Sequence, residues 1–293
     1  MSRKMPLIGA HLSVAGGLYK AAEAAAALAC GTVQIFSKNA NQWAGKPLTD
    51  DEVAAFKAAV RKARLKYPSA HDSYLINLAA PGDELFEKSI AAFVDELNRA
   101  EQLGLSYLVT HPGAHVGSGE DAGLRRVTAG LDRALKSTSG YKVKILLENT
   151  AGMGTTLGHR FEHLGRLITD SHDPGRLAVC FDTCHAFAAG YDLSTDAGYD
   201  ATFAEFGRTV GLRRLKLFHV NDSVKSLGSR VDRHAGIGLG MIGEQAFRRL
   251  VTDPRFARHP MILETPKDGP NGEPMDPVNL ARLRGYVAES AAA

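Results

Sequence analysis

The chain has 293 residues, with 35 basic and 32 acidic side chains and 3 cysteines. Three cysteines are too few for a disulfide framework, which excludes small disulfide-rich secreted proteins and indicates the reducing cytoplasm. The net charge of +3 permits a phosphate-bearing partner but excludes a histone-like polycation. No stretch approaches about 18 consecutive apolar residues, so we expect no membrane segment.

Short apolar runs alternate with amphipathic patterns along the chain. Two strand-like runs, 7–14 and 32–38, precede a helical pattern over 49–65 that begins behind a Thr–Asp cap. A weaker strand is expected at 66–71, which contains a proline and little apolar character, because helical patterns flank it. The second helical pattern, 84–103, is predicted to place five apolar residues on one face: Leu85, Ile90, Phe93, Val94 and Leu97.

The remaining strand-like runs complete a set of eight. They lie at 106–113, 143–150, 177–183, 215–222 and 261–266. Strands alternating with helices predict a parallel sheet buried on both faces. Eight units without a linker favour an α/β fold with one (β/α)8 TIM barrel over residues 1–293. A doubly wound open sheet is the alternative, but HLSVAGGL after the first strand lacks the G-x-G-x-x-G spacing of a dinucleotide site.

Six consecutive predicted strands finish in a side chain that binds metals or transfers protons. These residues are His71, His111, Glu148, Asp182, His219 and Glu264. In a barrel the carboxyl ends of the strands meet at one mouth, where active sites of such barrels are built. A lone histidine is more often a hydrogen-bonded core residue. Carboxylates that end apolar runs require a cation or donors, so six converging side chains indicate metal binding.

Three further candidates follow the sixth and seventh strands, in segments expected to be loops. His185 lies three residues after Asp182, and Asp232 and His234 have a spacing that places both side chains on one side of an extended segment. Five histidines and four carboxylates suit two or three metal ions. Mixed nitrogen and oxygen ligands favour Zn²⁺, with Mn²⁺ or Fe²⁺ possible. Metal-assisted hydrolysis follows, with a phosphodiester as the favoured substrate.

At these residues the sequence resembles the endonuclease IV family of metal-dependent apurinic/apyrimidinic endonucleases. The motifs span nearly the whole chain in order: IGAHLS (8–13), HDSYLINL (71–78), EQLGL (101–105), ENTAG (148–152), DTCHAFAAGYD (182–192), HVND (219–222), GSRVDRH (228–234) and LET (263–265). Motifs of this length and order are highly specific. The resemblance implies a barrel with its active site at the C-terminal mouth.

The resemblance further implies three zinc ions and their ligands. One ion would be bound by His71, His111 and Glu148, a second by Glu148, Asp182, His219 and Glu264, and a third by His185, Asp232 and His234. Glu148 would therefore bridge two ions and act in catalysis. The implied reaction is hydrolysis of the phosphodiester 5′ to an abasic site in duplex DNA. It leaves a 3′-hydroxyl and a 5′-deoxyribose phosphate, with trimming of blocked 3′ ends as a further activity.

The same resemblance implies residues that contact DNA. Tyr74 and Leu75 match the inserting residues of the family, and Asn41 and Trp43 lie in a second contacting segment. Many bacterial relatives carry an arginine at the position of Asn41 and a lysine at that of Val224, which puts a charged wedge and one phosphate contact in doubt. We expect a monomer acting on duplex DNA.

Two alternatives remain open. A sugar isomerase or epimerase also uses a metal-loaded barrel, although it needs only one or two metals and a closed pocket. A non-catalytic binder of damaged DNA is the other alternative, which nine intact ligands disfavour. The cysteines Cys180 and Cys184, next to two candidate ligands, are predicted to be small buried fillers rather than ligands.

Overall fold

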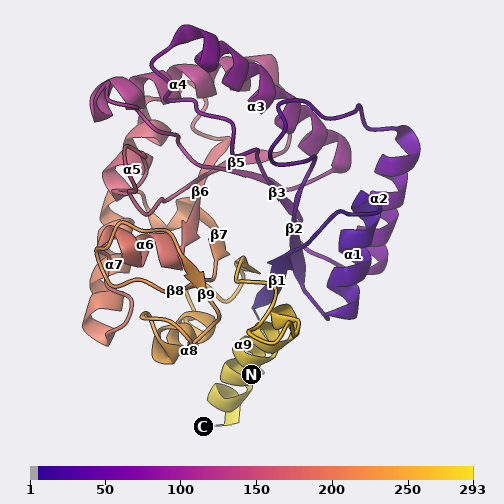
Figure 1. Cartoon of the computed structure of the whole chain (residues 1–293), viewed down its shortest axis with the longest axis vertical. Coiled ribbons are helices and arrows are strands. Elements are labelled where there is room, and N and C mark those ends of the chain that lie inside the picture. Colours follow the sequence, from indigo (N-terminus) through magenta and orange to yellow (C-terminus); the bar gives the residue numbers. More distant parts are fainter. Residues whose placement is uncertain (1–5, 293) are drawn as a thin grey trace.

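Eight parallel strands close into a barrel in the computed structural model, which describes residues 6–292 (Figure 1). Around the barrel the order is β1-β2-β3-β4-β5-β6-β7-β10. Their bounds are β1 Leu7–His11, β2 Thr32–Phe36, β3 Ser69–His71, β4 Tyr107–Thr110, β5 Lys144–Glu148, β6 Leu177–Asp182, β7 Leu215–His219 and β10 Pro260–Leu263. The predicted barrel is confirmed, including its short third strand.

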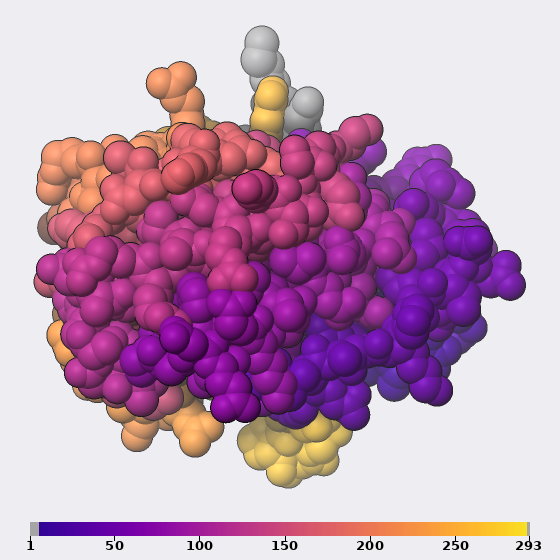
Figure 2. Space-filling model, turned by 90° about the horizontal axis from the view of Figure 1, so that it is seen from above, coloured from indigo at the N-terminus to yellow at the C-terminus, as the bar shows by residue number. Residues whose placement is uncertain are grey.

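Helices form the outer layer that covers the strands. Their bounds are α1 Leu18–Ala27, α2 Asp50–Lys62, α3 Asp83–Leu103, α4 Glu120–Ser137, α5 Phe161–Asp170, α6 Thr183–Ala189, α7 Asp196–Thr209, α8 Glu244–Thr252 and α9 Met275–Ala292, with a 3₁₀ turn at Leu212–Arg214. Seen from above the view of Figure 1, α3 and α4 form a continuous outer surface (Figure 2). Within residues 6–292, no helix is both long and apolar enough to cross a membrane.

The two predicted helices are present, with one error in the buried face. Thr49 caps α2 in a capping box with Glu52, as the Thr–Asp signal indicated. In α3 the residues Ile90, Phe93 and Leu97 are buried, but Leu85 is 40% exposed. Phe86 takes the inward position instead, because it lies four residues before Ile90, and Leu85 is rotated about 100° away from that face.

The core has two parts. The larger part lies between the strands and the helices, and a smaller cluster fills the barrel interior. The interior cluster consists of Tyr107, Val109, Leu146, Ala178, Cys180, Leu217 and Ile262. These side chains form an apolar floor under the mouth of the barrel, where the strands end.

One element at the mouth lies outside the strand–helix repeat. After β7 the chain forms a two-stranded antiparallel hairpin, β8 (Asp222–Ser223) with β9 (His234–Ala235). Asp222 stabilises the connection by accepting hydrogen bonds from the main-chain amides of Gly240 and Ile242. The hairpin brings residues that follow β7 back over the mouth, which the apolar pattern did not predict.

Candidate metal centre

The polar layer at the mouth follows from the two-residue period of the strands. Along β5, Leu146 belongs to the barrel interior, and Glu148, two residues later, points to the same side at the strand end. The same step leads from Val109 to His111, from Cys180 to Asp182, from Leu217 to His219 and from Ile262 to Glu264. The apolar floor therefore becomes a layer of candidate ligands one step higher along the strands.

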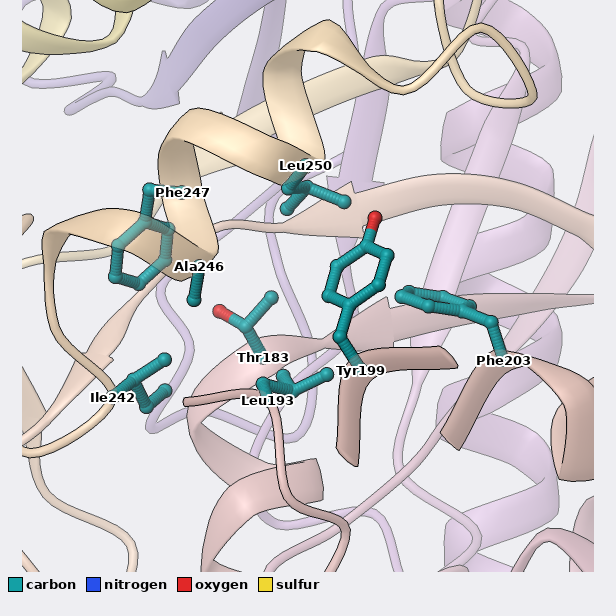
Figure 3. Close-up of a pocket in the computed structure, with 8 residues that line it drawn as sticks. All are labelled: Thr183, Leu193, Tyr199, Phe203, Ile242, Ala246, Phe247 and Leu250. Atoms are coloured by element: carbon teal, nitrogen blue, oxygen red, sulfur yellow. The ribbon is translucent and has the colours of Figure 1, made fainter. Parts of the chain in front are cut away.

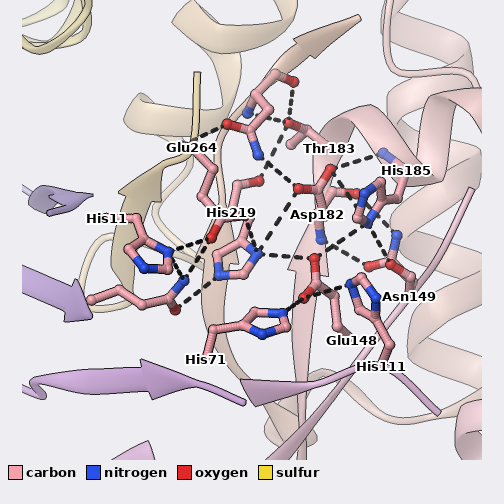
Figure 4. A network of polar contacts seen from close by, with 12 residues as sticks. His11, His71, His111, Glu148, Asn149, Asp182, Thr183, His185, His219 and Glu264 are labelled. Carbon is pink, nitrogen blue, oxygen red and sulfur yellow. Dashed lines mark hydrogen bonds and ion pairs between the residues drawn. The ribbon is translucent and has the colours of Figure 1, made fainter. Parts of the chain in front are cut away.

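Glu148 lies at the centre of this layer and is fully buried (Figure 4). Its Oε2 atom is 3.2 Å from His71 Nε2 and 3.4 Å from His111 Nε2. Its Oε1 atom is 2.9 Å from His219 Nδ1 and 3.2 Å from His185 Nδ1. The two carboxylate oxygens thus face two different sets of histidines, as a bridging ligand requires.

A second group surrounds His219. The strands β6 and β7 pair Asp182 directly with His219, so their side chains lie next to each other. His219 Nδ1 is 3.1 Å from Glu264 Oε2 and 3.9 Å from Asp182 Oδ2. Asn221 fixes Asp182 by donating to its Oδ2 atom at 2.7 Å. Ligand atoms of Glu148, Asp182, His219 and Glu264 all lie within 4.8 Å of one another.

The third group combines a helix with the hairpin. Asp232 places Oδ2 at 3.2 Å from His185 Nε2 and Oδ1 at 3.2 Å from His234 Nε2. The expectation that His185 lies in a loop is wrong, because α6 begins directly after β6. The Asp182 carboxylate starts this helix by accepting a hydrogen bond from the His185 amide at 2.8 Å. All nine candidate ligands therefore meet at the mouth, in three sets that match the predicted ones.

The charges at the mouth depend on one another. Burial would raise the pKa of Glu148, but the charges of His219 and His111 hold it well below its usual range. Burial would lower the pKa of His71, yet the hydrogen bond and charge of Glu148 raise it to about 10. Burial would also lower the pKa of His234, but the Asp232 carboxylate raises it to about 9. The buried carboxylates thus require positive charge at this place.

Divalent cations fit this requirement and the chemistry of the donor atoms. Imidazole nitrogens and carboxylate oxygens together suit borderline ions such as zinc. His234 Nε2 is buried without a hydrogen-bond partner, while its Nδ1 lies 3.1 Å from the Glu264 carbonyl oxygen. A buried ring nitrogen that makes no hydrogen bond yet lies 3.2 Å from the Asp232 carboxylate is the arrangement expected of a metal ligand.

Two cysteines also lie near these groups. Cys180 Sγ is within 4.8 Å of ligand atoms of Glu148 and His219, and Cys184 Sγ has the same relation to Asp182 and His234. Only a thiolate binds metal well, and burial raises the pKa of Cys180 well above its usual range and that of Cys184 to about 12. Both thiols are free and buried, which favours their role as packing residues.

The residues predicted to contact DNA lie on the rim. Tyr74 is 64% exposed and Asn41 is exposed, whereas Leu75 is half-buried. Trp43 is half-buried against the core, with the Lys88 ammonium 4.4 Å from its ring. A groove lies at this rim, next to the candidate ligands. Its lining includes His11, Phe36, Asn39, Ala40, Tyr74 and Lys267.

Two residues of the site were missed. His11, at the end of β1, has Nδ1 at 2.9 Å from Glu264 Oε1. Gln34 of β2 contacts both His219 and Glu264. A signal for each was present, since His11 ends the first strand and Gln34 is a polar residue within the apolar run TVQIF.

A separate pocket lies on the outer side of the barrel, between α7 and α8 (Figure 3). Its lining includes Leu193, Phe203, Ile242 and Phe247, and the hydroxyl of Tyr199 is bound to Asp253 at 3.1 Å. None of the nine candidate ligands lines it. This pocket is part of the packing between helices and strands and not a reaction site.

The fold and the site together define a TIM barrel with candidate metal ligands at its mouth. Residues 22–284 match a family model described as xylose isomerase-like TIM barrel. The solved D-psicose 3-epimerase has the same fold, with a TM-score of 0.67, 14% identity and coverage of 98% of each chain. At this identity the likeness concerns the fold alone.

More similar proteins identify the family within that class. The chain is 56% identical over 292 residues to a probable endonuclease 4 of Chloroflexus aggregans, covering 98% of this chain and 100% of the relative. A probable endonuclease 4 of Geobacter sulfurreducens is 50% identical, covering 96% and 94%. Endonuclease IV from Thermus thermophilus has a TM-score of 0.86 and 42% identity, covering 97% and 100%. The chain belongs to the endonuclease IV family.

Proposed function

We propose that this protein is a metal-dependent DNA-repair endonuclease that hydrolyses the phosphodiester 5′ to abasic sites in duplex DNA. The products would be a 3′-hydroxyl and a 5′-deoxyribose phosphate, and blocked 3′ ends would also be trimmed. The observation that carries this proposal is the arrangement of nine ligands in three sets, two of which share Glu148. The family membership gives independent support.

The proposal includes three zinc ions, with Mn²⁺ or Fe²⁺ as substitutes. His71, His111 and Glu148 would hold one ion, and Glu148, Asp182, His219 and Glu264 a second; His185, Asp232 and His234 would hold a third. Bound zinc supplies Lewis-acid chemistry and neutralises charge on a phosphodiester. Three divalent ions carry a charge of +6 against −4 from the four carboxylates, so the loaded mouth would attract a phosphate.

The protein side chains then have separate tasks. Glu148 holds two ligand sets in one geometry, because each of its oxygens faces a different set. Tyr74 and Leu75 would insert beside the abasic nucleotide, and Asn41 and Trp43 would line the duplex. The exposed ring of Tyr74, 5.4 Å from that of Phe36, stands where the groove meets the rim. Insertion of such side chains kinks DNA and exposes the nucleotide.

The sugar epimerase alternative has the same barrel but predicts a different site. One or two ions and a closed pocket suffice for a sugar, whereas here a third ligand set stands in a more open position. The Asp232 side chain is 39% exposed, and the Tyr74 side of the mouth is open to solvent. These features favour a long substrate that lies across the mouth.

The test is cleavage of a duplex with one abasic site by the purified protein, before and after chelation, with Zn²⁺ and Mn²⁺ added back. We expect one nick 5′ to the site, its loss on chelation and its return with metal. A matched undamaged duplex is the control. Binding without cleavage under every metal would support the non-catalytic binder, and turnover of a ketose without nicking would support the epimerase.

A further inference from the structure

Gln34 is a buried polar residue of β2, next to the apolar cluster of the barrel interior. It is fully buried and pairs with His11 of β1 and Ser69 of β3. The strands β4, β5 and β10 contribute apolar residues such as Val109, Leu146 and Ile262 to the same interior. Burying an amide without partners costs about 1–3 kcal/mol by protein mutational data. Specific contacts must therefore justify a glutamine at this position.

Those contacts join two candidate ligands of the same metal. Gln34 Oε1 accepts a hydrogen bond from His219 Nε2 at 2.9 Å, and Gln34 Nε2 donates to Glu264 Oε1 at 2.7 Å. Ser69 Oγ also donates to Oε1 at 3.4 Å, and His11 Nδ1 lies 3.1 Å from Nε2. One side-chain amide thus holds an imidazole and a carboxylate in a fixed relation, in the region that Figure 4 shows around His219 and Glu264.

The contact with His219 selects one form of its ring. Three other histidines of the site have Nδ1 at about hydrogen-bond distance from a main-chain carbonyl oxygen, which leaves Nε2 for a metal: His71, His185 and His234. The Nδ1 of His185 also lies 3.2 Å from Glu148 Oε1. His219 is reversed, because its Nδ1 faces Glu148 and Glu264 while its Nε2 faces Gln34. In neutral imidazole only one nitrogen carries hydrogen, so an acceptor at Nε2 leaves the Nδ1 lone pair free.

We propose that Gln34 is a positioning residue for the second metal of the cluster. It fixes His219 with hydrogen on Nε2 and Nδ1 directed at the ion, and it holds Glu264 beside it. This inference rests on the proposed metal function of the site. Main-chain carbonyl oxygens orient His71, His185 and His234, whereas a side chain orients His219.

Substitution of Gln34 separates this role from simple packing. Gln34→Met keeps the volume but removes both hydrogen bonds, and Gln34→Asn keeps the amide but is too short to span both partners. Loss of a residue that hydrogen-bonds a metal ligand typically weakens metal affinity about 10- to 100-fold. We therefore expect one of the bound zinc ions to be held more weakly by that factor in each variant. Gln102→Met, at an exposed position of α3, is the matched control.

The readout is zinc itself, measured as ions bound per chain and by competition with a chromophoric chelator, with circular dichroism to verify folding. Wild-type zinc content and affinity in both Gln34→Met and Gln34→Asn would overturn the inference. A different result would overturn the proposed function alone: the wild-type protein binds zinc but never cleaves abasic DNA, and the Gln34 variants bind zinc more weakly. Should Gln34→Met fail to fold, Gln34→Asn still decides the question.

Discussion

Arg99 of α3 holds the loop that carries Asn41 and Trp43. Its guanidinium is buried and donates from Nε to Ser37 Oγ at 3.0 Å and from Nη1 to the Lys46 carbonyl oxygen at 2.8 Å, with a further bond to the Ser37 carbonyl oxygen. Ser37 and Lys46 lie on either side of the proposed DNA-contacting residues. One side chain therefore fixes both ends of this rim segment.

Arg99→Lys tests this arrangement while keeping the charge next to Glu96, which binds Ser37 and Lys38. A lysine ammonium lacks the planar fork and cannot reach both ends of the loop. Hydrogen bonds to charged groups contribute about 1.5–3 kcal/mol each. Loss of two of the three bonds would therefore favour opening of the loop by about 3–6 kcal/mol.

The chain offers a direct probe, because Trp43 is its single tryptophan. For Arg99→Lys we expect red-shifted emission and stronger quenching by acrylamide. The KM for an abasic duplex should rise about 10-fold or more with little change in kcat, since the candidate ligands lie on other segments. Arg133→Lys, whose pair with Glu87 is exposed, is the control. Wild-type emission and KM in Arg99→Lys would refute the reasoning.

Four further predictions concern other parts of the molecule. Glu148→Ala should abolish abasic-site cleavage and lower bound zinc; near-wild-type values would contradict the bridging role. Tyr74→Ala should raise KM more than it lowers kcat in steady-state kinetics, and the reverse would place Tyr74 in the chemistry. Zinc binding at pH 7.5 should release protons, because metal-free His71 and His234 have pKa values raised to about 10 and 9 and remain protonated; titration heats independent of the buffer would exclude this. Thr49→Ala should cost about 1 kcal/mol in urea unfolding through the lost helix cap, and an unchanged midpoint would contradict it.

The strand ends were predictable because their geometry is regular. Parallel strands bring their carboxyl ends to one mouth, and the two-residue period decides which side chains point inward. An apolar run that ends in Glu148 or His219 therefore predicts a strand, and it also predicts that the last side chain points into the barrel. The short strand Ser69–His71 was predicted from its neighbours rather than its own composition, because its pairing with β2 and β4 supplies what the sequence lacks.

Other features depend on contacts between distant residues. The start of α6 depends on the Asp182 carboxylate acting as its cap, so the same residue ends a strand and begins a helix. The partners of Gln34 lie on β7 and after β10, about 185 and 230 residues away along the chain. No local pattern contains such pairings.

The third ligand set comes from other parts of the fold than the strand ends. Six candidate ligands come from strand ends, a layer that any eight-stranded barrel can offer. His185, Asp232 and His234 come from α6 and from the segment that includes β9, both outside the eight barrel strands. Because inward positions at the strand ends are already occupied, a further ion requires segments that fold over the mouth. The hairpin and α6 supply these segments, so the proposed third ion would depend on them and not on the barrel strands alone.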